Sequence, residues 1–295
     1  MQDSHKQNVG QTAPLRESRP YRLGVALSGG GARGFAHAGA LMAIEEAGLK
    51  PDVIAGVSAG SVIAVLYAGG IKPKDMPDIF DKTGFRNFAR FKLGHGGIFC
   101  IDRFKDFIIK TIGGKNMLED LAIPTYIGAT DLDHGTPAVF STGEIGPRML
   151  ASCSIPIVFK PVVIDGTSYV DGGVLRNLPS WIIRDKCETL IGINVSPMRP
   201  MKDYSSIIEV AMRTYNLMAK ANQTADMELC DLAVEMSEIA AYRVFNLKDI
   251  NKVFMSGYVH TRHALRKAGL WHPDSSNDNT DFENISNTDS NPTKK

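Results

Sequence analysis

The chain has 295 residues, with 33 basic and 32 acidic side chains, and 43% of its residues are hydrophobic. This composition is typical of a protein with a sizeable buried core and excludes global disorder. The net charge of +1 excludes a nucleic-acid binder that acts through bulk charge, although it does not exclude a local basic patch. The four cysteines are widely spaced and form no C-x-x-C pair, so neither a zinc ribbon nor a redox motif is expected.

Both ends of the sequence are polar and lack a hydrophobic pattern. Residues 1–20 have no apolar segment of the kind found in secretory signals, and residues 272–295 are rich in Ser, Asn, Asp and Thr. We therefore expect two disordered tails, 1–20 and 272–295, around one domain over 21–271. No apolar stretch reaches the roughly 20 residues that a membrane-spanning helix needs. A cytoplasmic protein is expected, with at most peripheral contact to a membrane.

Between the tails, short apolar runs alternate with helical patterns. This order indicates a mostly parallel, buried sheet covered by helices, which is an α/β fold. In such sheets the chemistry lies at the turns that follow the strands. The predicted strands are 21–27, 52–57, 124–130, 138–141, 168–170 and 189–195, and the predicted helices are 33–48, 59–68, 177–186, 204–222 and 249–268.

The turn after the first strand is rich in glycine. Gly29, Gly31 and Gly34 have the spacing G-x-G-x-x-G between a strand and a helix. Backbone N–H groups in such a loop can bind a pyrophosphate, but they suit equally the oxyanion of an acyl-transfer reaction. A dinucleotide site requires an acidic residue about 20 positions later. Residues 54–58 read Ile-Ala-Gly-Val-Ser, which disfavours a nucleotide-binding oxidoreductase.

The turn after the second strand contains a candidate nucleophile. Residues 56–60 read Gly-Val-Ser-Ala-Gly, which is G-x-S-x-G between an apolar strand and a small-residue helix. A serine at the tip of such a sharp turn adopts strained dihedral angles, so Gly56 and Gly60 must lack bulk. The following helix directs its first amides at Ser58, and the Ala59 N–H is a natural oxyanion donor. A tight turn without catalytic function is the alternative interpretation of this pentapeptide.

Ser58 needs a base that accepts its proton. None of the seven histidines has a distinctive setting, although His260 and His263 in a late helix would serve a Ser-His triad. Asp171 has a clearer setting, because it ends a strand and begins the run Asp171-Gly172-Gly173. A carboxylate there can come beside Ser58 at the same end of the sheet. A plain Asp-Gly turn between strands is the alternative.

Together, the segments 29–34 (GGGARG), 56–60 (GVSAG) and 171–173 (DGG) resemble the three motifs of the patatin-like phospholipase family, in the family's order. Residues 151–161 and 177–179 are similar to bacterial members of the family. The resemblance is strong over about residues 22–196. It implies a patatin-like, three-layer α/β/α fold with a mostly parallel central sheet.

The resemblance implies a catalytic dyad without a metal or a cofactor. Ser58 would attack an ester carbonyl, and Asp171 would act as general base and then return the proton to the leaving alcohol. Because an ordinary carboxylate with a pKa near 4 is a weak base for a serine, we expect Asp171 to be partly desolvated and hydrogen-bonded to Ser58. The expected oxyanion donors are the N–H groups of Gly29, Gly30, Gly31 and Ala59, and the expected support of the loop comes from Arg33 and Gly34.

Residues 85–110 combine positive charge with aromatic side chains. The segment has six cations against two acids, and six of the 13 phenylalanines of the chain. Such a segment suits transient contact with an anionic lipid surface, and Gly94, Gly96 and Gly97 would let it hinge as a lid. Alternatively, its phenylalanines pack in the core and its cations are solvated. The cations are Arg86, Arg90, Lys92, Arg103, Lys105 and Lys110, and the phenylalanines are Phe85, Phe88, Phe91, Phe99, Phe104 and Phe107.

The sequence thus predicts a serine lipid acyl hydrolase whose substrates are phospholipids, lysophospholipids or acylglycerols. An acyltransferase would use the same dyad and acyl-enzyme with a different acceptor. A non-catalytic lipid-binding module on the same scaffold is the other alternative. The expected partner is a lipid ester rather than a nucleic acid, and the sequence leaves the oligomeric state and the head group open.

Overall fold

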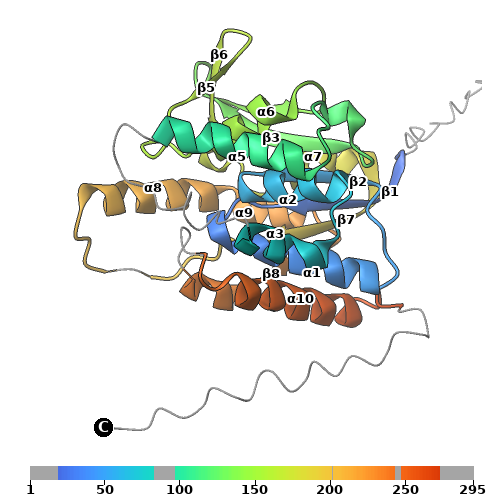
Figure 1. The fold of residues 1–295 in the computed structure, drawn as a ribbon. Coiled ribbons are helices and arrows are strands. Elements are labelled where there is room, and N and C mark those ends of the chain that lie inside the picture. Colours follow the sequence, from blue (N-terminus) through green and yellow to red (C-terminus); the bar gives the residue numbers. More distant parts are fainter. Residues whose placement is uncertain (1–18, 83–96, 201, 243–246, 273–295) are drawn as a thin grey trace, which may run out of the picture.

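The computed structural model describes residues 19–82, 97–200, 202–242 and 247–272 (Figure 1). Its centre is an eight-stranded sheet with the order β5-β6-β3-β2-β1-β7-β8, in which β4 also pairs with β3. The strands are β1 (Tyr21–Leu27), β2 (Val53–Val57), β3 (Thr125–Asp131), β4 (Thr136–Phe140), β5 (Val162–Ile164), β6 (Thr167–Asp171), β7 (Cys187–Asn194) and β8 (Leu232–Glu235).

The sheet is parallel over most of its width and antiparallel at one edge. The strands β3, β2, β1, β7 and β8 run parallel to their neighbours, whereas β4 and β6 run antiparallel to β3, and β5 antiparallel to β6. All of β2 and the last five residues of β1 are buried, as expected for strands that helices cover on both faces. The predicted three-layer α/β fold with a mostly parallel sheet is confirmed.

Helices cover both faces of this sheet, with most of them on one face (Figure 1). The larger hydrophobic cluster joins the sheet to α1, α2, α3 and α10 and extends to α5 and α6, and the smaller cluster lies under α7. The helices are α1 (Phe35–Glu46), α2 (Ala59–Ala68), α3 (Met76–Lys82), α5 (Gly97–Thr111), α6 (Ile145–Cys153), α7 (Ser180–Ile183), α8 (Ile207–Ala221), α9 (Gln223–Glu228) and α10 (Ile250–Lys267).

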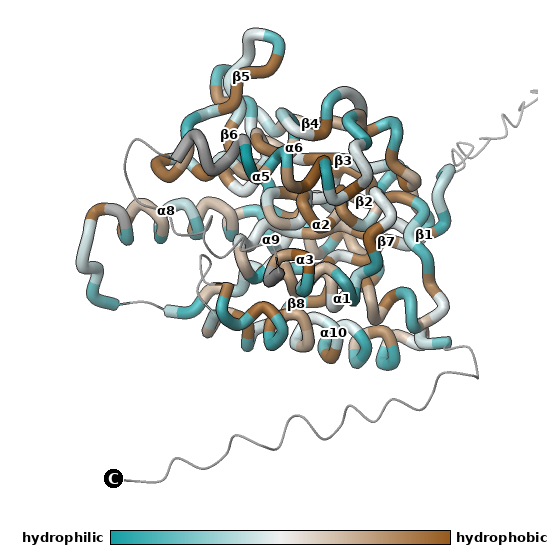
Figure 2. The backbone as a smooth tube through the Cα atoms, in the orientation of Figure 1, coloured by the Kyte–Doolittle hydropathy of each residue, from teal (hydrophilic) through white to brown (hydrophobic). Residues whose placement is uncertain are grey.

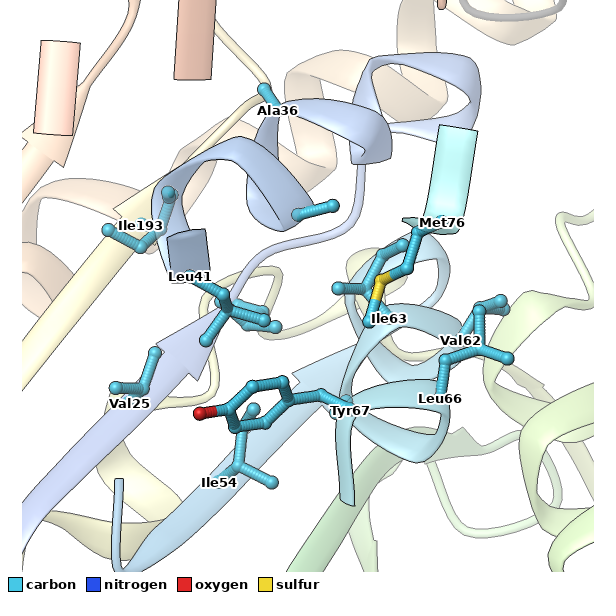
Figure 3. Packing of buried hydrophobic residues seen from close by; sticks show 14 of the residues in the cluster. Val25, Ala36, Leu41, Ile54, Val62, Ile63, Leu66, Tyr67, Met76 and Ile193 are labelled. Carbon is cyan, nitrogen blue, oxygen red and sulfur yellow. The ribbon is translucent and has the colours of Figure 1, made fainter. Parts of the chain in front are cut away.

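The larger cluster fixes the part of the sheet that carries the two glycine-containing turns. In Figure 3, Val25 of β1, Ile54 of β2 and Ile193 of β7 lie beside Leu41 of α1 and Tyr67 of α2. Figure 2 shows hydrophobic residues concentrated in these central strands and in α2, whereas hydrophobic and hydrophilic turns alternate along α10. The turns after β1 and β2 are therefore anchored in the larger hydrophobic cluster.

Helices α1 and α10 meet at unusually short range through two glycines. A side chain at Gly39 would collide with the carbonyl of Phe254, and one at Gly257 would collide with the carbonyl of Ala36. The two backbones can approach this closely only because neither position carries a Cβ atom. This contact fixes α10 against the helix that follows the glycine-rich loop.

Most of the predicted elements are present, and the differences have local causes. The strand 21–27 and the helix 59–68 have the predicted bounds, whereas the predicted helix 177–186 shrinks to α7 and a 3-10 turn, Arg184–Lys186. Pro179 restricts the backbone before that helix and delays its start. The sequence patterns did not predict β5, β8 and α9, which are only three to six residues long, and they also missed the longer helices α3, α5 and α6.

The structure describes the basic aromatic segment 85–110 only from residue 97 onward, where it forms α5. The cations and phenylalanines of residues 85–96 lie outside the described residues. The same holds for residues 1–18 and 273–295 of the two tails. In α5, Phe107 packs against the core and meets the Phe80 ring edge-on at 5.5 Å, while Arg103 and Lys110 are exposed. This part of the segment agrees with the core-packing interpretation. In the described ranges, no helix combines the length and the apolar content that crossing a membrane requires.

Candidate active site

Ser58 lies at the tip of a sharp turn between β2 and α2. Its dihedral angles, φ 51° and ψ −123°, are strained for a residue with a side chain. A Cβ atom at Gly56 would collide with the carbonyl of Gly60, and one at Gly60 would collide with the carbonyl of Leu27. Glycine is therefore required two residues before and two residues after Ser58, as the spacing predicted. Ser58 is only 5% exposed.

Two neighbouring serines satisfy the backbone of this turn. The N–H of Ser58 donates to Ser152 Oγ at 2.8 Å, and Ser152 Oγ in turn donates to the Gly128 carbonyl at 2.6 Å. The hydroxyl of Ser61 donates to the Ser58 carbonyl at 2.6 Å. These bonds hold the strained conformation in place. The N–H of Ala59 begins α2 and has no carbonyl partner within the helix, so it is available to a bound anion.

The register of the sheet brings Asp171 level with Ser58. Val57 on β2 pairs with Gly128 on β3, so Ser58 follows at the level of Ala129. Asp171 on β6 pairs with Ala129 from the other side. Because β6 is antiparallel to β3, the strand that ends at Asp171 runs in the direction opposite to β2 and β3.

The carboxyl of Asp171 is fully buried, and the polar groups that face it are uncharged at neutral pH. Oδ1 accepts the Gly173 N–H at 2.8 Å, while Oδ2 is buried and has no hydrogen-bond partner among the described residues. Burial raises the pKa of Asp171 to about 6, against the lowering effect of the Ser58 hydroxyl, the Gly173 N–H and the Tyr215 hydroxyl. The expected desolvation of Asp171 is thus present, whereas its hydrogen bond to Ser58 stays a prediction.

The glycine-rich loop packs directly on the serine turn. A Cβ atom at Gly29 would lie 3.3 Å from Ser58 Cβ, and one at Gly34 would lie 2.7 Å from Ala59 Cβ. The segment Gly31–Gly34 forms a 3-10 turn before α1 begins at Phe35. The first and third glycines of the motif, Gly29 and Gly34, therefore lie where a side chain would press on the serine turn.

The N–H and the carbonyl of Gly29 already have hydrogen-bond partners within the protein, so the Gly29 N–H is not free to bind an oxyanion. Its N–H donates to the Asn177 carbonyl at 3.2 Å, and its carbonyl accepts from Ser28 Oγ at 2.9 Å and from Ser196 Oγ at 2.5 Å. In a trans peptide the next N–H points away from that carbonyl, so the Gly30 N–H faces the opposite side from these hydroxyls. Of the four expected oxyanion donors, Gly30, Gly31 and Ala59 keep an N–H without such a partner in the described structure.

Arg33 attaches the glycine-rich loop to two distant segments. Its guanidinium donates to the carbonyls of Tyr242 at 2.9 Å, Pro197 at 3.3 Å and Ala240 at 3.2 Å. All three acceptors are backbone carbonyls, which suits a side chain that ties segments of backbone together. These contacts agree with the supporting role expected of Arg33.

His37 lies beneath the same loop and contacts its backbone. Its Nε2 lies 2.8 Å from the Ser28 carbonyl and donates to it, whereas Nδ1 is buried without a partner in the described structure. Burial lowers the pKa of His37 to about 4, so the ring is neutral. His260, an alternative base, instead faces the Glu238 carboxylate at 2.8 Å and the Ser256 carbonyl at 2.8 Å.

Tyr215 and Cys153 also face Asp171, and neither is among the site residues expected from the sequence. Tyr215 comes from α8, and its hydroxyl faces the carboxyl of Asp171 across the space beside Gly173. The Cys153 thiol lies 4.0 Å from Ser61 Oγ, and burial, followed by the charge of Asp171, raises its pKa to about 12. Cys153 lies within the family-like block 151–161, but no role was assigned to it, and Tyr215 lies outside every motif.

A strained serine between a parallel strand and a helix, beside a glycine-rich loop and a buried carboxyl, defines an α/β protein with a nucleophile-elbow type of site. The model of the patatin-like phospholipase family matches residues 25–182, which is more than half of the chain. The chain belongs to this family.

Several named relatives are similar to part of this chain. Lysophospholipase nte1 of Aspergillus fumigatus is 32% identical over 168 residues, which are 53% of this chain and 11% of the fungal protein. Lysophospholipase NTE1 of Saccharomyces cerevisiae is 31% identical over 192 residues, which are 59% and 11% of the two chains. The uncharacterized NTE family protein Rv1063c of Mycobacterium tuberculosis is 33% identical over 195 residues, or 64% and 54%.

The chain therefore spans about a tenth of the length of the fungal relatives and about half that of the mycobacterial one. Among solved structures, VipD from Legionella pneumophila is similar with a TM-score of 0.50 and 14% identity, over 84% of this chain and 67% of that one. At this identity the similarity concerns the fold.

Proposed function

We propose that this protein is a serine lipid acyl hydrolase that cleaves carboxylic esters through a Ser58–Asp171 dyad. The observation that carries the proposal is the strained Ser58 turn at the sheet level of a fully buried Asp171, whose Oδ2 has no hydrogen-bond partner among the described residues and whose pKa burial raises to about 6. A carboxylate with this pKa is a better proton acceptor at neutral pH than an exposed aspartate, yet it is still mostly ionised there.

In the first step, Ser58 Oγ attacks the ester carbonyl carbon while its proton passes to the Asp171 carboxylate. The carbonyl oxygen becomes an oxyanion, which the N–H groups of Gly30, Gly31 and Ala59 would bind. Collapse of the tetrahedral intermediate breaks the bond to the alcohol, and Asp171 returns its proton to the departing alkoxide. The product of this step is an acyl ester on Ser58.

In the second step, the acyl group passes to water. Asp171 takes a proton from the water as it attacks the acyl ester, and returns it to Ser58 Oγ when the fatty acid leaves. An alcohol in place of water would give acyl transfer with the same groups and the same proton path. The dyad alone therefore supports both reactions, and the acceptor decides between them.

The substrate class rests on the family and its named relatives. Membership in the patatin-like phospholipase family and similarity to fungal lysophospholipases support phospholipids, lysophospholipids or acylglycerols as substrates. Contact with an anionic membrane surface through the segment 85–110 is part of the same proposal. In its described part, the exposed side chains of Arg103 and Lys110 on α5 are the groups that can face such a surface.

The decisive test uses Ser58→Ala and Asp171→Asn, with Ser256→Ala as a matched control. Ser256 is a partly buried serine on α10 that contacts His260 and not the dyad. We expect fluorophosphonate labelling and ester hydrolysis in the wild type and in Ser256→Ala, and at least a roughly 1000-fold loss of hydrolysis in both dyad variants. Hydrolysis retained in Ser58→Ala or Asp171→Asn would contradict the dyad.

A lipid panel then separates the candidate reactions. Released fatty acid and released head group are measured for a phospholipid, a lysophospholipid and an acylglycerol, with and without an added acceptor alcohol. Fatty acid as the sole acyl product indicates a hydrolase, whereas a new ester of the added alcohol indicates an acyltransferase. Folded wild-type protein that neither turns over lipid nor reacts with fluorophosphonate would support the non-catalytic lipid-binding module.

A further inference from the structure

Tyr215 reaches the dyad from a part of the fold that contains none of the sequence motifs. It lies on α8, which packs against the 3-10 turn Gly172–Val174 that follows Asp171. The position that a Cβ atom of Gly173 would occupy touches the Tyr215 hydroxyl, and the same point lies 3.2 Å from Asp171 Oδ1. The hydroxyl and the carboxyl oxygen thus flank one point, and the absence of a side chain at Gly173 makes room for the phenol.

We propose that Tyr215 is a positioning residue of the dyad, whose hydroxyl donates to the Asp171 carboxylate and holds the ionised base in place beside Ser58. This inference deepens the proposed function and rests on it, because it assigns a role relative to Asp171 as general base. Tyr215 would act through Asp171 and would not touch the reacting ester.

The surroundings of Asp171 explain why one additional donor matters. The groups that face it from neighbouring elements are the Ser58 hydroxyl after β2, the Gly173 N–H after β6, the Cys153 thiol from α6 and the Tyr215 hydroxyl from α8. All four are uncharged at neutral pH. No cation among the described residues faces this carboxylate, so only uncharged donors can stabilise its ionised form, and losing one of them raises its pKa.

The chemistry of a phenol in this position allows only one role. Burial, and after it the charge of Asp171, raises the pKa of Tyr215 well above its ordinary value. The hydroxyl therefore keeps its proton over the working pH range and acts as a donor to the carboxylate. Tyr215 cannot be the base that activates Ser58, and its effect must appear in the titration of Asp171.

Two contacts beside this helix keep it against the turn after Asp171. The Nδ2 atom of Asn222, which follows α8, donates to the Leu175 carbonyl at 2.8 Å. Arg176 forms an ion pair with the buried Asp226 on α9. Leu175 and Arg176 both lie within five residues after Asp171. These contacts therefore attach α8 and α9 to the segment that carries Asp171. These contacts, none of which involves Ser58, hold the helix that carries Tyr215 beside Asp171.

The test compares Tyr215→Phe with Thr214→Val, which removes a hydroxyl from the same helix. Thr214 is exposed, and its hydroxyl donates to Val210 on its own helix at 3.0 Å. The profile of kcat/KM against pH is recorded from pH 5 to pH 9 with a short-chain soluble ester. We expect the acidic limb of Tyr215→Phe to move about one pH unit upward, with activity approaching that of the wild type above the limb, and Thr214→Val to overlay the wild type.

A second measurement does not depend on turnover. The carbonyl stretch of the protonated carboxyl is titrated by infrared difference spectroscopy in the wild type and in Tyr215→Phe, with Asp171→Asn to identify the band. The pKa of Asp171 should be higher in Tyr215→Phe, and 3-fluorotyrosine at position 215, a stronger donor, should lower it. An unchanged Asp171 titration, or a loss of activity that is equal at every pH, overturns the inference.

These readouts separate the two proposals. A shifted Asp171 titration in a protein that hydrolyses no ester and resists fluorophosphonate would leave the contact in place and reject the proposed function. Hydrolysis that depends on Ser58 and Asp171, together with an Asp171 titration that ignores position 215, would reject the role of Tyr215 and keep the proposed function.

Discussion

The two halves of the candidate site are built in different ways. On the side of Ser58, the strand β2, the serine turn and the glycine-rich loop meet backbone to backbone, and collisions at Gly56 and Gly60 leave no room for another residue. On the side of Asp171, Tyr215 arrives on α8 through side-chain contacts, which include one buried ion pair and a few hydrogen bonds. The difference teaches that the nucleophile depends on backbone shape, whereas the surroundings of the base depend on side-chain chemistry that substitution can tune.

The largest expected effect comes from breaking the backbone contacts of the first half. Gly60→Ala places a Cβ atom on the carbonyl of Leu27, and backbone cannot move aside as a flexible side chain can. We expect a loss of about 4 kcal/mol in the free energy of unfolding, measured by chemical denaturation, or failure to accumulate folded protein.

Gly146→Ala is the matched control for this substitution. Gly146 lies in α6, and a Cβ atom there would meet only the methylene groups of the Lys105 side chain, which can move. Its expected cost is below about 1 kcal/mol, since alanine also favours the helical conformation. Equal destabilisation by the two substitutions would show that the serine turn tolerates change as well as an ordinary helix does.

On the side of Asp171, removing one charge should destabilise the protein. Asp226 is fully buried and pairs with Arg176, which also lies over the Trp181 ring. Asp226→Asn leaves the guanidinium without its ionic partner, and we expect a loss of about 3 kcal/mol. Hydrogen–deuterium exchange should increase over residues 207–228 and stay unchanged over β1 and β2, because the two halves have separate supports.

A second aspartate–arginine pair serves as the control. Asp231 pairs with Arg184 at 2.7 Å, but its side chain is half exposed. Because water screens such a pair, Asp231→Asn should cost about 1 kcal/mol or less. If Asp226→Asn raised exchange equally in α8 and in β1, the distinction between the two halves would fail.

The smallest expected effect concerns acid stability. His37 has a folded pKa of about 4 against an ordinary value of 6.5, so its contribution is present above pH 6.5 and is lost as the pH falls toward 4. Between pH 7 and pH 5 this amounts to about 2 kcal/mol. Asp171 has a raised pKa of about 6 and acts in the opposite direction, because protonating it in acid relieves its burial.

Comparing variants isolates the two contributions. The unfolding free energy of His37→Gln should fall less between pH 7 and pH 5 than that of the wild type, by about 2 kcal/mol. Asp171→Asn should make the protein more sensitive to acid over the same interval. Parallel pH dependences in the wild type and His37→Gln would show that His37 does not link the glycine-rich loop to pH.

The first half could be predicted from sequence because its constraints are local. The spacing of Gly29, Gly34, Gly56 and Gly60 records steric requirements within a few residues of each turn, and the strands beside them are continuous apolar runs. The sequence also indicated Asp171, as the end of a strand followed by two glycines. It could not show that β6 runs antiparallel, because strand direction depends on pairing with β3 and not on the pattern of β6 itself.

The second half could not be predicted for a related reason. Tyr215 lies 44 residues after Asp171, in a helix whose amphipathic pattern describes only which side faces inward. Which group that side meets depends on the path of the chain through β7 and on the contact of α8 with the turn after Asp171. Likewise, the Gly29 N–H has the correct spacing for an oxyanion donor, but the carbonyl of Asn177, nearly 150 residues away, occupies it.

The glycine contact between α1 and α10 limits where this domain can be truncated. The family match ends at residue 182, yet β7 pairs with β1 at the centre of the sheet and α10 lies against α1 through Gly39 and Gly257. A fragment that stopped at the family boundary would turn β1 into an open edge and strip the cover from α1, which favours aggregation. Expression of this domain should therefore extend through α10, because the homologous segment and the cooperative folding unit have different ends.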